Sequence, residues 1–195
     1  MQNMWNEKDA ESLAAHYAAE GVARDVADCL YMTRLLGRDK RLVLYGGGNS
    51  SVKRRARDAA GGERDVLCVK ASGADMAAVE PADLPALDID QLRRLRSLDR
   101  LAEADMRGAQ RACLLDGGAN DPSVETLLHA FLPHKFIAHC HANAVLSVTN
   151  QPDGATRAAT LFAKQAAVVP YTMSGLELAQ RAAEAFEAAP DSIGL

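Results

Sequence analysis

The segment LPHKFIAHCHANAV, residues 132–145, places two histidines one residue apart, His139 and His141, after a short apolar run. Such a run is typical of a β-strand, along which alternate side chains share one face. The two imidazoles would therefore lie close together, with Cys140 turned to the opposite face. A pair of imidazoles is suitable for half of a site for a divalent transition metal. The alternative interpretation is a pair of partly solvated histidines at a strand end.

A carboxylate precedes this pair in the chain. Glu125 lies in the first turn of a predicted helix, where the helix dipole favours a negative charge, so capping is its simplest role. His129 follows one turn later on the same face of that helix. A carboxylate and imidazoles together are suitable ligands for a divalent metal that polarises a carbonyl oxygen. The residue types thus indicate a candidate metal-dependent site.

Two glycine-containing loops add a candidate phosphate site. GGGNSS, residues 46–51, offers successive backbone N–H groups in a tight turn, which is the kind of concave nest that holds an anion. Glycine loops that merely join hairpin strands are the common alternative. KASG, Lys70–Gly73, adds a cation, a hydroxyl and another glycine at the end of the next predicted strand. Two such loops are able to close around one phosphate.

The helices and strands that position these residues are predicted from hydrophobic periodicity and from the glycines that end each element. Helical patterns extend over Asp9–Glu20 and Val22–Leu36, and each is followed by a glycine, as helices often are. Strands are predicted next, in apolar runs bounded by glycine turns. These strands cover residues 41–45, residues 49–53 on the far side of the glycine loop, and residues 65–70 after the turn at Gly61 and Gly62.

The second half alternates helices with short strands. Because several strands are joined by tight turns rather than by helices, we predict an α/β fold with a partly antiparallel sheet covered by helices. The predicted elements are an extended segment 79–88, helices 89–98 and 102–115, a helix beginning at Asp121–Pro122, a strand 135–138, a helical turn from Ala142, a helix 156–164, a strand 166–171 and a helix 176–188.

Composition restricts the class of protein. The 195 residues are 48% hydrophobic and 25% charged, which is enough to bury the core of one domain. A net charge of −4 without a basic stripe makes nucleic acid and anionic membranes poor candidate partners. No membrane span or secretory signal is recognised, so we expect a cytoplasmic protein. The scattered cysteines are predicted to be buried, reduced thiols, namely Cys29, Cys68, Cys113 and Cys140.

Four stretches occur together in one order: LYGGGNSSVK, VKASG, PSVETLLHAFLPHKFIAHCHANAVLSV and VVPYTMSGLELAQ. Together they resemble the class II aldolase/adducin family, from Tyr17 to the end of the chain. The sequences of these motifs are most similar to the aldolase region of bacterial bifunctional aldolase/short-chain dehydrogenases, which are related to rhamnulose-1-phosphate aldolase. The identification depends on the agreement of all four motifs, since none of them would suffice alone.

The resemblance implies a three-layer α/β/α fold with a mainly antiparallel central sheet. It also implies a lyase that uses zinc, or another divalent transition metal, to split a ketose 1-phosphate into dihydroxyacetone phosphate and an aldehyde. Glu125 corresponds to the family's acid–base carboxylate and is a further candidate metal ligand, and His139 and His141 correspond to two of its three zinc histidines. His129 and His134 fall outside the ligand positions and are interpreted as structural. The residues that would hold the substrate phosphate are Gly48, Asn49, Ser50, Ser72, Gly73 and Ser123.

The chain departs from the family pattern at its end. The family's third zinc histidine follows the strand that DSIGL, residues 191–195, would begin. We therefore expect one domain over residues 1–195 that is incomplete at its C-terminus, with weakened metal binding and little or no turnover. No G-x-G-x-x-G motif follows a predicted strand, so no dehydrogenase domain is expected within these residues.

Other functions share this scaffold. Epimerases of pentulose phosphates and dehydratases of thiosugar phosphates use the same metal chemistry but break a different bond. An adducin-like, metal-free interaction module is a further alternative; the histidine pair argues against it, and the missing third ligand argues for it. The family resemblance also implies a homo-oligomer, specifically a tetramer.

Overall fold

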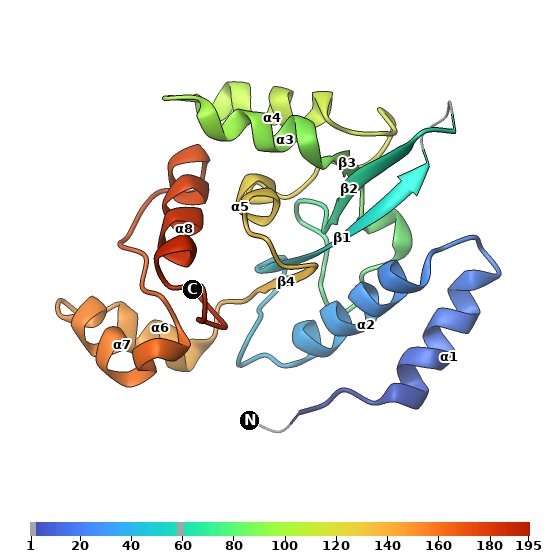
Figure 1. The fold of residues 1–195 in the computed structure, drawn as a ribbon. Helices are drawn as coiled ribbons and strands as arrows, with labels where there is room; N and C mark the ends of the chain where they lie inside the picture. Colours follow the sequence, from blue (N-terminus) through green and yellow to red (C-terminus); the bar gives the residue numbers. More distant parts are fainter. Residues whose placement is uncertain (1–2, 58–60) are drawn as a thin grey trace.

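A four-stranded sheet forms the centre of the molecule (Figure 1). The computed structural model describes residues 3–57 and 61–195. Within them the strand order is β3-β2-β1-β4, and every neighbouring pair is antiparallel. The strands are β1 (Asn49–Arg57), β2 (Glu63–Val69), β3 (Ala86–Asp88) and β4 (Phe136–His139).

Helices cover both faces of this sheet (Figure 1). One face carries α1 (Glu7–Ala18) and α2 (Arg24–Arg38), and the other carries α3 (Ile89–Arg94), α5 (Thr126–Phe131) and α8 (Leu176–Ala188). The remaining elements are α4 (Glu103–Ala112), α6 (Asn143–Thr149), α7 (Gly154–Phe162) and the 3₁₀ turns η1 (Pro81–Asp83), η2 (Leu95–Ser97) and η3 (Ala163–Gln165).

The alternation of side chains along β2 divides the core into two clusters. Val66 and Cys68 pack with α1 and α2, whereas Leu67 and Val69 pack with α3, α5 and α8. All four side chains are at most 5% exposed. Burial of each large aliphatic side chain contributes about 1.5–3 kcal/mol, so both faces of the sheet are held by apolar packing. The predicted three-layer α/β/α architecture with an antiparallel sheet is confirmed.

The register between β1 and β4 determines where the candidate site lies. Asn49 is directly opposite His139 at the end of this pair of strands. Because side chains alternate along β1, Asn49 and Ser51 face α5, while Ser50 and Val52 face α2. The start of β1, the end of β4 and the start of α5 therefore meet at one edge of the sheet.

The predicted strand at residues 41–45 is wrong. The amides of Leu42 and Val43 bond back to the carbonyl oxygen of Asp39, which continues the turn at the end of α2. Tyr45 has a φ of 54°, in the left-handed region, and no strand continues through such a residue. The apolar pattern of this segment instead reflects the burial of Val43, which is 3% exposed.

The predicted strand at residues 166–171 is also wrong. Within this segment only Ala166 forms a β-bridge, a parallel one with Gly194. The amide of Ala167 donates to the carbonyl oxygen of Gly194. Within the described residues the segment finds no second strand, because its apolar side chains line a cavity instead. A run of apolar residues alone does not distinguish these two environments.

All four cysteines are free thiols; Cys29, Cys68 and Cys113 are buried and Cys140 is partly buried. Burial raises the pKa of Cys29 to about 12, so this thiol stays protonated at neutral pH. No helix among the described residues has the length and apolar character that crossing a membrane requires.

Candidate functional site

Glu125 lies at the centre of the candidate site. It occupies the N-cap position of α5, and its amide donates to the hydroxyl oxygen of Ser123 at 3.2 Å. Its Oε2 atom accepts two hydrogen bonds, from Nδ2 of Asn49 at 2.6 Å and from Nδ1 of His139 at 2.7 Å. Its Oε1 atom has one long contact, with the hydroxyl of Ser174 at 3.4 Å.

These partners change the acidity of Glu125. Burial alone would raise its pKa, but the hydrogen bond and the electrostatic interaction with His139, together with the hydrogen bond of Asn49, outweigh this effect. The pKa falls to about 2, so the carboxyl group is ionised at neutral pH. The ionised carboxylate thus has one oxygen engaged by two donors and a second, Oε1, with a single long contact.

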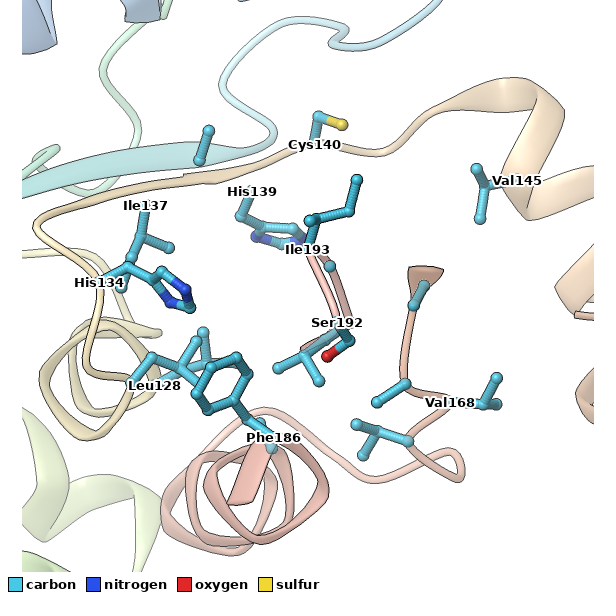
Figure 2. Close-up of a pocket in the computed structure, with 18 of the residues that line it drawn as sticks. Leu128, His134, Ile137, His139, Cys140, Val145, Val168, Phe186, Ser192 and Ile193 are labelled. Atoms are coloured by element: carbon cyan, nitrogen blue, oxygen red, sulfur yellow. The ribbon is translucent and has the colours of Figure 1, made fainter. Parts of the chain in front are cut away.

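His139 and His141 lie together, as their spacing predicts. Their rings are 4.9 Å apart between centroids at an interplanar angle of 61°. Cys140 points to the opposite side of the chain from His139 (Figure 2). A Cβ atom on Gly47 would lie 3.3 Å from Nδ1 of His141, so the glycine loop passes directly beside this imidazole.

The candidate phosphate loops converge on the same edge of the sheet. A Cβ atom on Gly46 would lie 3.3 Å from the carbonyl oxygen of Gly73, so the two glycine loops touch. The amide of Ser72 donates to the carbonyl of Asp121, and the amide of Ser123 donates to the carbonyl of Lys70. Three motifs that are far apart in the sequence thus surround one region next to Glu125.

Within these loops, some side chains have other partners. The hydroxyl of Ser50 is fully buried and lies 2.5 Å from that of Thr33, on the α2 side of β1. Ser123 accepts a hydrogen bond from Asn49, whose amide group is also bonded to Glu125. Of the residues predicted to hold a phosphate, Asn49, Ser50 and Ser123 therefore bond to other protein groups. Ser72 and Gly73 are exposed.

Lys70 lies beneath its loop rather than over it. The residue is 1% exposed, and its ammonium group donates to the carbonyl oxygens of Ala71 and Ala74, at 3.1 and 2.6 Å. Burial lowers its pKa, and the carboxylates of Asp83 and Asp75 oppose this effect. The lysine is thus engaged by two carbonyl groups of its own loop rather than exposed to a ligand.

The histidine pair fits a divalent transition metal in donor type. The carboxylate of Glu125 only accepts hydrogen bonds, so Nδ1 of His139 carries a proton and, in the neutral ring, Nε2 keeps a lone pair for a metal. A metal-binding histidine commonly donates to a carboxylate in this way. The described residues contain no cluster of three His, Cys, Asp or Glu side chains arranged around one point. Two imidazole ligands for a metal are therefore present, and Glu125 is the hydrogen-bond partner of one of them.

A cavity of about 580 Å³ opens beside Glu125 and His139 (Figure 2). Its walls are mostly apolar and come from β4, α5, the α6–α7 pair, α8 and the last residues of the chain. Leu128, His134 and Phe186 form one side, and Ser192 and Ile193 lie across from them (Figure 2). Sequence reasoning did not anticipate this cavity, because it forms between segments that are distant in the sequence.

Comparison with known proteins agrees with the motif pattern. Residues 27–194 match a family profile described as the Class II Aldolase and Adducin N-terminal domain. An uncharacterized oxidoreductase of Bacillus subtilis (strain 168), YuxG, is 33% identical over 166 residues, which are 85% of this chain and 24% of the relative. The chain therefore spans about a quarter of the length of that protein.

Two solved structures share the fold. The N-terminal Class II Aldolase domain of a conserved protein from Thermoplasma acidophilum is 34% identical, with a TM-score of 0.83 over 95% of this chain and 81% of that one. An L-fuculose 1-phosphate aldolase is 18% identical, with a TM-score of 0.54 over 89% of this chain and 72% of that one. At this identity the second match concerns the fold alone.

Proposed function

Because the chain belongs to the class II aldolase and adducin family, we propose that it forms the catalytic region of a metal-dependent lyase. The substrate is a phosphorylated sugar, and the reaction splits a ketose 1-phosphate into dihydroxyacetone phosphate and an aldehyde. The observation that carries this proposal is the 2.7 Å hydrogen bond between Glu125 and His139, next to two glycine loops. This bond supports a site in which an ionised carboxylate and two imidazoles lie beside two glycine loops that would bind an anion.

The loops bind the phosphate and so fix the substrate relative to Glu125. The residues proposed for this role are Gly48, Asn49, Ser50, Ser72, Gly73 and Ser123. The exposed Ser72 and Gly73 offer a hydroxyl and a backbone N–H, while Asn49, Ser50 and Ser123 shape the loops through their internal bonds. Binding energy from a remote phosphate positions the reacting carbon, which is a large part of enzymatic rate enhancement.

Glu125 moves the proton at the carbon next to the substrate carbonyl. Its Oε2 atom is engaged by Asn49 and His139, so Oε1 is the atom that exchanges this proton. A divalent ion, zinc or a similar metal, would be held by His139 and His141, with Glu125 as an alternative ligand, and would supply Lewis-acid polarisation of the carbonyl. Ser174, 3.4 Å from Oε1, would orient the reacting oxygen.

Metal content and aldol cleavage test this proposal together. We expect purified chain incubated with zinc to retain about one ion, and His139→Ala to lose it, because two imidazoles provide the metal donors. His16→Ala is the matched control, since His16 lies on α1 and its side chain is 67% exposed. Cleavage of a panel of ketose 1-phosphates, measured as released dihydroxyacetone phosphate, follows on the same samples.

Equal zinc retention by wild type and His139→Ala would contradict the proposed metal site. If the protein binds metal but does not cleave the sugar phosphate, the product identifies the alternative. Inversion at a hydroxyl-bearing carbon of the sugar would indicate an epimerase, and loss of water from the sugar would indicate a dehydratase. A metal-free, adducin-like module is the second candidate, because the described residues present two imidazoles rather than three clustered donors. That candidate predicts no metal in any variant.

The whole protein's context is proposed on the same basis. The Bacillus relative is named an oxidoreductase and is much longer than this chain, which fits a bifunctional aldolase/dehydrogenase arrangement. We propose a cytoplasmic homo-oligomer, with a tetramer as the expected state. Light scattering of the purified protein measures the number of subunits directly.

A further inference from the structure

A group of polar side chains is buried between β1 and α5. Ser51 and His129 are completely inaccessible to solvent, and Asn49 is 4% exposed. Within the described residues, no buried side-chain nitrogen or oxygen lacks a hydrogen-bond partner. Buried polar groups of this kind are retained only when each of their bonds is satisfied, so the direction of each bond can be assigned.

The assignment begins at Glu125. Its carboxylate only accepts, so the group of Asn49 that faces it at 2.6 Å is the NH₂, and the amide oxygen Oδ1 faces the other way. That oxygen lies 2.5 Å from Nε2 of His129, which must therefore donate. Burial lowers the pKa of His129 to about 3, so the ring is neutral and its Nδ1 accepts.

The last link follows from the neutral ring. Nδ1 of His129 lies 2.8 Å from the hydroxyl of Ser51, which is the donor. The complete order is Ser51 O–H to His129 Nδ1, His129 Nε2–H to Asn49 Oδ1, and Asn49 Nδ2–H to Glu125 Oε2. Every donor in this chain points toward Glu125, and reversal of any one bond would place two donors or two acceptors face to face.

We propose that Ser51 and His129 form a buried hydrogen-bond chain that fixes the amide of Asn49 and, through it, the orientation of the Glu125 carboxylate. His129 is then a positioning residue rather than a passive core histidine. It holds Asn49 in the one orientation that donates to Oε2, and this leaves Oε1 accessible. The role in a reaction depends on the proposed function of Glu125, but the geometry of the chain does not.

Two substitutions of His129 separate positioning from packing. In His129→Gln the side-chain amide reaches the place of Nε2 and still donates to Asn49, whereas in His129→Asn it reaches only the place of Nδ1 and keeps the contact with Ser51. Both variants replace the ring with a polar amide. Because Gln is also closer to His in volume than Asn is, packing alone would favour Gln in stability, so the readout that separates the two roles is the hydrogen bonding of Asn49 rather than stability. The proposed chain predicts that Gln restores the wild-type state of Asn49 and that Asn does not.

Hydrogen exchange of the Asn49 side-chain amide, followed by NMR on the full chain, provides the first readout. We expect exchange in His129→Asn to be faster than in wild type by about tenfold, the equivalent of one lost buried hydrogen bond, and exchange in His129→Gln to stay near wild type. Ser51→Ala removes only a hydroxyl. Its His129 should keep the Nε2–H tautomer of wild type, visible in the ¹⁵N shifts, because Oδ1 of Asn49 still faces Nε2 and needs a donor there.

These readouts require no turnover, so they separate the two proposals. A wild-type protein without cleavage activity but with the expected tautomer and exchange pattern would contradict the proposed lyase function. It would leave the proposed hydrogen-bond chain supported. Equal exchange rates in the Gln and Asn variants, or an Nδ1–H tautomer of His129 in wild type, would overturn the chain. Where cleavage is present, His129→Asn should lower kcat more than it changes KM, and Gln should restore kcat.

Discussion

At Gly48 the backbone lies closer to its neighbours than a side chain would allow. Its φ is +69°, and a Cβ atom would lie 2.8 Å from the carbonyl oxygen of His139 and 3.0 Å from the sulfur of Met76. The glycine therefore brings the loop into contact with the end of β4, where His139 is located. This close approach, rather than flexibility alone, explains a glycine directly before Asn49.

Gly48→Ala should destabilise the fold by roughly 2–4 kcal/mol, from a left-handed alanine and from a contact with backbone that cannot move freely. Gly61→Ala is the matched control, since Gly61 has a similar φ of +83° and, among the described residues, no atom within 4 Å of a Cβ atom, and should lose only about 1 kcal/mol. Urea unfolding measures both free energies. Similar losses in the two variants would show that strain, not close approach, dominates at Gly48.

At the scale of residues, the sequence predicts types better than partners. The spacing of His139 and His141 correctly places their rings together, and Glu125 is correctly brought to them. The buried bonds of Ser50 and His129 were not predicted, because they depend on which face of β1 each side chain occupies. The N-S-S stretch at residues 49–51 carried that signal, since only alternate residues of a strand can face α5.

At the scale of elements, Lys53 connects β1 to the segment between α5 and β4. Its ammonium group donates to the carbonyl oxygens of Leu132 and His134, at 2.6 and 2.7 Å. Leu132 is the C-cap of α5, so the lysine satisfies a carbonyl that the helix leaves free. Burial, followed by the nearby charge of Arg93, lowers the pKa of Lys53 to about 7.

This pKa predicts a pH-dependent contribution to stability. An unfolded lysine has a pKa of about 10.4, so between about pH 7 and pH 10 the unfolded chain binds more protons at Lys53 than the folded chain does. The free energy of unfolding therefore rises with pH through this group, with a limiting slope of about 1.4 kcal/mol per pH unit. Lys53→Met lacks this dependence. The free energy of unfolding of wild type minus that of Lys53→Met should therefore increase from pH 7 to pH 10.

Urea unfolding of both proteins at several pH values measures that difference, in which the other titrating groups cancel. A difference that stays constant with pH would mean that Lys53 remains charged in the fold, held by its two carbonyl partners. Lys135→Met is a suitable control, because Lys135 lies nearby with a side chain that is 58% exposed.

Elements with a strong local signal were predicted, and those set by distant partners were not. The helices near residues 7–18, 24–38 and 176–188 lie within two residues of their predicted ends at most positions, because periodicity and a terminal turn define them locally. The segments 41–45 and 166–171 have the apolar pattern of strands, but among the described residues they find no strand partner beyond isolated bonds. Strand formation depends on a neighbour, which a single segment does not encode.

At the scale of the whole molecule, packing is uneven. Both core clusters lie against the sheet, one under α1 and α2 and the other under α3, α5 and α8. The α6–α7 pair lies to one side of both clusters (Figure 1). α6 buries no side chain, α7 buries only Gly154 and Ala158, and the two helices chiefly contact each other. The cavity beside His139 occupies the space between this pair and the rest of the protein.

Local opening should therefore begin at α6 and α7. Separation of this pair from the sheet disrupts neither core cluster, whereas exposure of the β1–β2 amides requires that both be broken. We expect amide hydrogen exchange in residues 143–162 to be faster than in β1 and β2 by roughly a hundredfold or more. Hydrogen-exchange mass spectrometry of the intact chain measures both regions in one experiment, with α8 as an internal reference that packs on the core. Equal protection of α6–α7 and the β1–β2 hairpin would place the pair within the cooperative core, and the cavity wall would then be as rigid as the sheet that carries His139.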